Sequence, residues 1–222
     1  MKKITLFVLA AVLGITAMAQ TAANDKFTKA MEQKIAGLDT TRGMESWKDL
    51  AAAFERIGDA EKTQWLPYYY AAYSHIMIGY SYMEGNPMGG NAEKTDPEAD
   101  AAEKLLDKAI GLSKASSETW VLKKMIASLR MMGDPMSRYM TYGPVAEQAL
   151  NTAKQMDSGN PRVYMLEAQD KFFTPEQFGG SKEEAKILFE KSKELYGTFK
   201  PESSIHPNWG MGQVMYFLSQ YK

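Results

Sequence analysis

The chain contains two histidines, His75 and His206, and no cysteine. Imidazole and thiolate are the side chains that most often bind zinc or act as base or nucleophile near neutral pH. The two histidines lie far apart in the sequence, and neither has a second ligand at metal-site spacing. The lack of cysteine excludes a disulfide framework, a zinc–thiolate site and a cysteine nucleophile. These residue types therefore predict neither a catalytic site nor a metal site.

A glycine pair, Gly179-Gly180, precedes an amphipathic segment and raises the question of a phosphate-binding loop. Such a loop follows a strand, and Lys and then Ser or Thr follow its glycines. Here a helical pattern precedes the pair, and Ser181-Lys182 follows it in the reverse order. Glycine also permits the positive φ angles that an enlarged turn needs. We therefore interpret the pair as a turn, with Ser181 capping the next helix.

Methionine is unusually frequent, and Met132, Met136 and Met140 recur at four-residue spacing. Thioether ligands suit copper(I), but Pro135 interrupts the helical spacing of this set. Methionine also fills irregular gaps between helices, and we prefer that interpretation. The acidic residues lie beside lysines at helical spacing, as on solvated faces, and form no paired-acid motif. We expect no cofactor, no metal and no enzymatic activity.

The first residues have the pattern of a secretory signal peptide. Two lysines precede an apolar run over residues 4–15, and Ala17 and Ala19 form a small-residue cleavage site. This run is shorter than the roughly 20 residues of a membrane span. The sequence therefore predicts a signal peptide over 1–19, cleaved after Ala19, and a periplasmic or secreted chain over 20–222 without a membrane span.

The charge balance argues against nucleic acid as a partner. The chain has 26 basic and 27 acidic residues, a formal net charge of −1. This balance provides no electrostatic footprint for nucleic acid or anionic lipid. The mature chain is long enough to bury its own core as a single domain.

Helix-favouring residues dominate after the signal segment, and alternating strand patterns are almost absent. Asp96-Pro97 and Asn160-Pro161 each have a cap residue before a proline, which predicts that helices begin there. We predict an all-α fold of about nine helices, near residues 24–37, 44–58, 63–83, 98–114, 117–132, 143–157, 161–173, 181–197 and 207–221.

Three of these segments repeat one spacing of small, large and small residues along a helical stripe. They are Ala102-x3-Leu106-x2-Ala109, Ala146-x3-Leu150-x2-Ala153 and Ala185-x3-Phe189-x2-Ser192. The pattern resembles the second helix of the tetratricopeptide repeat, which carries A-x3-F-x2-A. The resemblance implies one tetratricopeptide-like domain, a helical hairpin array or right-handed α-solenoid. An unrelated helical bundle is the alternative.

The repeats are longer than those of the tetratricopeptide family. Second helices start 44 residues apart between Ala102 and Ala146, and 39 apart between Ala146 and Ala185, against 34 in the family. We expect the extra residues to form loops over 84–97, 133–143 and 174–180. The last of these also resembles the T component of tripartite substrate-binding transporters, which implies an accessory role beside a transporter.

The helix expected over residues 63–83 is the most aromatic segment, and its aromatic residues cannot all share one stripe. First helices of tetratricopeptide hairpins line the concave face, and tyrosine and tryptophan suit recognition because each combines a large contact with a polar tip. The predicted partner-binding residues are Trp65, Tyr69, Tyr73, Tyr80 and Trp120. The alternative is a central helix packed on all sides.

The sequence thus predicts a non-enzymatic scaffold or adaptor that binds a protein or peptide of the cell envelope in a concave helical groove. The alternative is a small-ligand-binding accessory protein of an envelope transport system. A closed aromatic pocket of roughly 300 Å³ or more would favour the small ligand. An open groove would favour a peptide.

Overall fold

The computed structural model describes residues 24–85 and 90–221, so the predicted signal peptide and its cleavage site lie outside the described residues. Within these ranges the chain is all-α, with nine α-helices, two short 3-10 helices and no strand. The α-helices are residues 24–35, α2 (Met44–Glu61), α3 (Leu66–Ser81), α4 (Ala92–Leu112), α5 (Ser117–Gly133), α6 (Pro135–Met156), α7 (Pro161–Phe173), α8 (Lys182–Thr198) and α9 (Met211–Leu218). The 3-10 helices are η1 (Leu38–Thr40) and η2 (Glu176–Phe178).

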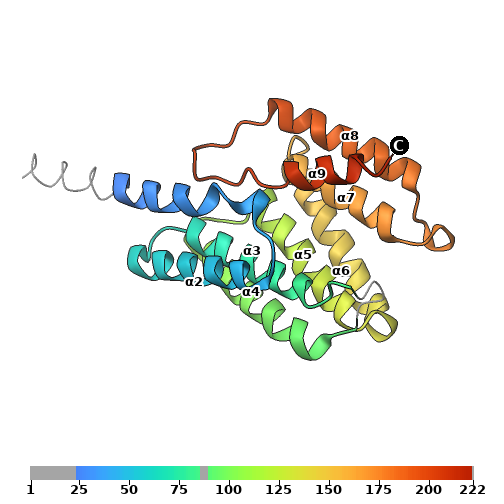
Figure 1. The fold of residues 1–222 in the computed structure, drawn as a ribbon, viewed down its shortest axis with the longest axis horizontal. Coiled ribbons are helices and arrows are strands. Elements are labelled where there is room, and N and C mark those ends of the chain that lie inside the picture. The colour runs from blue at the N-terminus through green and yellow to red at the C-terminus, as the bar shows by residue number, and fades with distance from the viewer. Residues whose placement is uncertain (1–23, 86–89, 222) are drawn as a thin grey trace, which may run out of the picture.

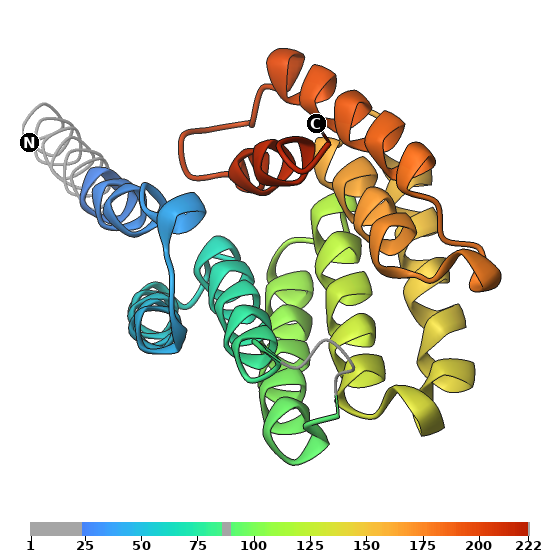
Figure 2. The same ribbon diagram turned by 45° about the vertical axis from the view of Figure 1, so that its right-hand side comes forward.

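Successive helices pack as hairpins, from α2 against α3 through α5 against α6, and α7 and α8 form the last pair. Figure 1 shows this order running from the blue N-terminal helices to the orange and red C-terminal ones. In Figure 2 the array curves, and the dark red α9 lies on its inner side. The predicted all-α hairpin array is confirmed. No helix in the described part of the chain is long and apolar enough to cross a membrane.

The repeated stripes hold the hairpins together. All nine residues of the three stripes are buried, from Ala102 in α4 to Ser192 in α8. The small positions allow a neighbouring helix to approach, and each buried Leu or Phe stabilises the packing by about 1.5–3 kcal/mol. Ser192 is buried at no cost in hydrogen bonds, because its hydroxyl donates to the Pro161 carbonyl at 2.8 Å.

The predicted start of the fourth helix is wrong. Helix α4 begins at Ala92, so Pro97 lies inside it and Asp96 is not its cap. Asp96 instead forms a two-pronged ion pair with Arg138 at 2.6 and 2.8 Å, which lowers the pKa of its carboxyl. Pro97 has no N–H to donate to the Glu93 carbonyl, four residues earlier in the helix. Both residues are exposed. Water can therefore replace the missing hydrogen bond.

The loop predicted over residues 133–143 is also wrong, because α6 begins at Pro135. The Asp134 side chain caps the helix by accepting a hydrogen bond from the Ser137 amide at 3.4 Å. Pro135 occupies the first helical position, where a missing N–H has no effect. The capping interaction outweighs the proline and glycine content that suggests a loop, and α6 continues through Pro144.

The turn before α8 is confirmed. Gly179 has a left-handed φ of 91°. Gly180 lies so close to the Thr174 carbonyl that a Cβ would overlap it, so glycine is required there by space. The Ser181 hydroxyl accepts a hydrogen bond from the Glu184 amide at 3.1 Å, which caps α8. The glycine pair thus turns the chain between α7 and α8.

Candidate functional site

Helix α3 is buried on nearly all sides. Its residues from Leu66 to Ser74 are all buried, including four tyrosines. The helix packs against α2 and α4 and also touches α5. Burial raises the pKa of Tyr69 and Tyr73, so both phenols stay protonated.

The chain's own C-terminal residues cover one face of α3. The Trp209 ring stacks on Tyr73 with centroids 4.2 Å apart, and its indole N–H donates to the Tyr69 hydroxyl at 3.0 Å. The Tyr70 hydroxyl donates to the Ile205 carbonyl at 3.0 Å. We call residues 205–217 the C-terminal segment. This segment lies on the inner side of the array, over the face of α3 where the sequence analysis predicts that a partner binds.

The C-terminal segment is fixed at both ends of the array. Gly210 has a left-handed φ of 110°, and its amide donates to the Asp39 carboxylate in η1 at 2.8 Å. The Tyr196 hydroxyl of α8 donates to the Trp209 carbonyl at 2.5 Å. The segment therefore joins the first part of the chain to the last hairpin.

A buried polar network lies beneath Trp209. Arg162 of α7 is fully buried and pairs through two nitrogens with the Glu118 carboxylate of α5. The Asn160 amide donates to Glu118 at 2.8 Å, and the Tyr69 hydroxyl donates to it at 3.2 Å. Burial opposes the charge on Arg162, but Glu118 outweighs this effect and raises the pKa of the guanidinium. The network therefore links α3, α5 and α7.

The predicted partner-binding residues fall into separate places. Trp65 is half-buried and lies edge-on to Tyr69, with ring centroids 5.8 Å apart. Tyr69 and Tyr73 lie beneath Trp209, while Tyr80 donates to the Met125 carbonyl at 3.2 Å. Trp120 lines a different surface, a cleft between α4, α5 and α6. The role of these five residues in binding stays a prediction.

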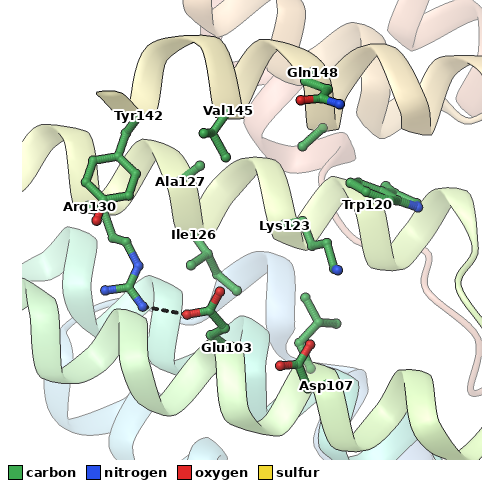
Figure 3. A pocket seen from close by; sticks show the side chains of 12 residues that line it. Glu103, Asp107, Trp120, Lys123, Ile126, Ala127, Arg130, Tyr142, Val145 and Gln148 are labelled. Carbon is green, nitrogen blue, oxygen red and sulfur yellow. Dashed lines mark hydrogen bonds and ion pairs between the residues drawn. The ribbon is translucent and has the colours of Figure 1, made fainter. Parts of the chain in front are cut away.

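The cleft has a volume of about 290 Å³. Figure 3 shows it between α4 below and α6 above, with α5 along its length. Apart from Trp120, sequence reasoning misses its lining. The lining residues are Glu103, Leu106, Asp107, Trp120, Lys123, Ile126, Ala127, Arg130, Tyr142, Val145, Gln148 and Ala149.

A sequence signal for this cleft exists. The lining residues of α5 begin with Trp120, Lys123, Ile126 and Ala127, at offsets of 0, 3, 6 and 7. Those of α6 start at Tyr142 and repeat the same offsets. Residues at these offsets share one face of a helix. The sequence pattern that indicates this cleft is therefore a pair of helical stripes, each of which begins with an aromatic residue and continues with polar and apolar residues.

The charges of the cleft are unevenly paired. Arg130 forms ion pairs with Asp100 at 2.8 Å and with Glu103 at 2.7 Å. Lys123 instead lies over the Trp120 ring, with its nitrogen 4.8 Å from the centroid. Leu106, Ile126, Ala127 and Ala149 supply the apolar part of the lining. The cleft thus combines aromatic side chains, an apolar floor and the ammonium of Lys123.

Both histidines are engaged away from this cleft. His75 lies between Glu98 at 2.7 Å and Glu55 at 3.3 Å. Burial opposes its charged form, but hydrogen bonds to the two glutamates outweigh burial and raise the pKa of the imidazole above its ordinary value. His206 contacts the Ser203 hydroxyl at 2.7 Å and the Glu202 carboxylate at 3.3 Å. Within residues 24–85 and 90–221, no three His, Cys, Asp or Glu side chains could hold a metal ion together.

Comparison with known proteins shows which proteins this chain is related to. No family model matches the chain, and no curated protein does. Among solved structures, the chain is similar to the HusA haemophore from Porphyromonas gingivalis, with 34% sequence identity and a TM-score of 0.74. The match covers 87% of this chain and 92% of that chain. A haemophore is a binding protein rather than an enzyme, in agreement with the expectation from the sequence. The chain belongs to the family of the HusA haemophore.

Proposed function

We propose that this protein binds haem, or a closely related tetrapyrrole, as an exported carrier that serves iron acquisition. The observation that carries the proposal is the 34% identity to a haemophore over 87% of the chain. It favours the small-ligand alternative from the sequence over a protein or peptide partner. The inner face of α3 supports the same choice, because Trp209 already covers Tyr73 there.

We further propose the cleft between α4, α5 and α6 as the ligand site. Small-molecule sites combine apolar and aromatic walls with a few polar groups, in volumes of about 300–1,000 Å³. The cleft, at about 290 Å³, lies just below this range. The cleft is partly open to solvent, so a flat macrocycle would insert one edge and leave the other in solvent. Trp120 and Tyr142 supply aromatic faces for this edge.

Recognition through the macrocycle fits this lining better than ligation of the iron. Haem iron is held in proteins by His, Cys, Met or Tyr. Among the described residues that line the cleft, only Tyr142 belongs to these types. In Figure 3 its ring reaches from α6 toward Arg130. Stacking and apolar contact would therefore provide most of the affinity.

Export is part of the proposal. The predicted signal peptide over 1–19 and the relationship to a haemophore both support a periplasmic or secreted carrier. The remaining chain, residues 20–222, would form a single ligand-binding domain, consistent with the continuous packing from α2 to α9.

The test is a titration of the mature chain, from Gln20, with haemin, followed by absorbance and by quenching of tryptophan fluorescence. Trp120→Ala should weaken binding about ten-fold or more, because an aromatic contact contributes about 0.5–1.5 kcal/mol beyond its buried area. Trp65→Ala is the matched control and should bind as wild type. Absence of haemin binding by the wild type would refute the proposal. Loss of binding in Trp65→Ala alone would move the site to α3.

A further inference from the structure

The cationic side chains in and beside the cleft differ in whether a carboxylate of the protein pairs with them. Two carboxylates, Asp100 and Glu103, contact the Arg130 guanidinium. Lys124, the neighbour of Lys123 in sequence, points to the other side of α5 and pairs with Asp170 at 2.6 Å. Arg130 and Lys124 are therefore occupied by structural partners.

Lys123 is different. Within residues 24–85 and 90–221 it takes part in no ion pair, and its ammonium lies over Trp120. Figure 3 shows this ammonium between α5 and α4, facing the side of α4 that carries Asp107. Lys123 is half-buried, as expected for a lysine whose aliphatic stem packs against the protein while its ammonium stays accessible. A cation beside an aromatic face is suited to a ligand that has both a flat apolar body and a negative group.

We propose that Lys123 forms a subsite for a carboxylate of the ligand. The cleft would then select flat apolar molecules with an acidic edge over their neutral counterparts. This inference rests on the proposed function and adds the ligand's orientation: the acidic edge lies at the Trp120 end, and the apolar body extends along α5 toward Ile126 and Ala127. Asp107, on the side of α4 that faces Lys123, would compete for the ammonium and repel the ligand's carboxylate.

The inference makes opposite predictions for the two charges. Lys123→Gln keeps most of the side-chain stem over Trp120 but removes the charge, so it should weaken binding of an acidic ligand about ten-fold. Asp107→Asn should strengthen that binding, because it removes the competing carboxylate. Neither change should alter binding of a neutral ligand. A residue that only supported the fold would affect both ligands equally.

The experiment compares protoporphyrin IX with its dimethyl ester in one buffer that contains a non-ionic detergent. We expect the wild type to prefer the free acid about ten-fold, Lys123→Gln to lose this preference with ester binding unchanged, and Lys123→Arg to retain it. Lys104→Gln, on an exposed face of α4 outside the cleft, is the matched control. A preference that persists in Lys123→Gln would overturn the subsite alone. Failure of the wild type to bind either compound would overturn the proposed function as well.

Discussion

Replacing Trp209 with alanine tests how firmly the C-terminal segment covers α3. The side chain is only 2% exposed, stacks on Tyr73 and donates a hydrogen bond to Tyr69. A buried Trp→Ala change costs about 3–5 kcal/mol in the free energy of unfolding. Each kcal/mol lowers the Tm of a domain of this size by about 2–4 °C. The Tm of Trp209→Ala should therefore fall by about 6–20 °C.

The assay is thermal unfolding by circular dichroism, combined with ligand titration well below the melting transition. Trp209→Phe keeps a ring over Tyr73 but lacks the indole N–H, so it should cost only about 0.5–1.5 kcal/mol. Haemin binding should survive in both variants, because Trp209 does not line the cleft. A melting point of Trp209→Ala equal to that of wild type would refute the described packing. Loss of haemin binding in a still folded Trp209→Ala would place the ligand on α3 instead.

Two further predictions concern the pH dependence of stability and the space for a Cβ atom at two glycines. The pKa of His75 is raised above its ordinary 6.5 in the folded state, so its stabilising effect is complete below that value and is lost as pH rises through the folded pKa. The Tm difference between wild type and His75→Gln should therefore be larger at about pH 5.5 than at about pH 9, and an unchanged difference would contradict the ion-pair role of His75. Gly180→Ala should destabilise the chain by about 1–3 kcal/mol in urea unfolding, because its Cβ meets the Thr174 carbonyl. Gly197→Ala in α8, where a Cβ meets nothing, should be neutral or stabilising by up to about 1 kcal/mol; the reverse order would contradict the described turn.

Local patterns explain what the sequence predicts well. Ala185, Phe189 and Ser192 share one stripe of α8, and all three are buried, because a helix places such residues on one face regardless of its neighbours. The starts of α4 and α6 are mispredicted for a related reason. Pro97 is tolerated inside α4 because it is exposed, and exposure depends on the neighbouring helices rather than on local spacing.

The covering of α3 depends on contacts that no local pattern encodes. The hydrogen bond from Trp209 to Tyr69 joins residues 140 positions apart. The pair of Arg162 with Glu118 spans 44 positions. The sequence identifies α3 as aromatic and leaves open whether it faces a groove or the core. That choice is decided by the C-terminal segment, whose own pattern predicts only a helix.

Helix α5 connects the buried network to the candidate cleft. Glu118 and Lys124 fix it to α7 through Arg162 and Asp170. Trp120, between them in sequence, faces the cleft instead. The helix that carries the aromatic wall is therefore held in place independently of any ligand. A site that is already ordered loses less conformational entropy on binding.

The same network also holds the C-terminal segment over the aromatic face of α3. Besides pairing with Glu118, Arg162 donates to the Trp209 carbonyl at 3.4 Å, so the ion pair that fixes α5 also holds Trp209 over Tyr73. Breaking it would loosen both places at once, whereas a change confined to the cleft would leave the cover intact. This arrangement gives a physical reason why a hairpin array of this kind is proposed to bind a small ligand rather than a peptide. Its inner face over α3 is filled by its own chain, whereas the cleft that contains Trp120 and Tyr142 stays accessible between α4, α5 and α6.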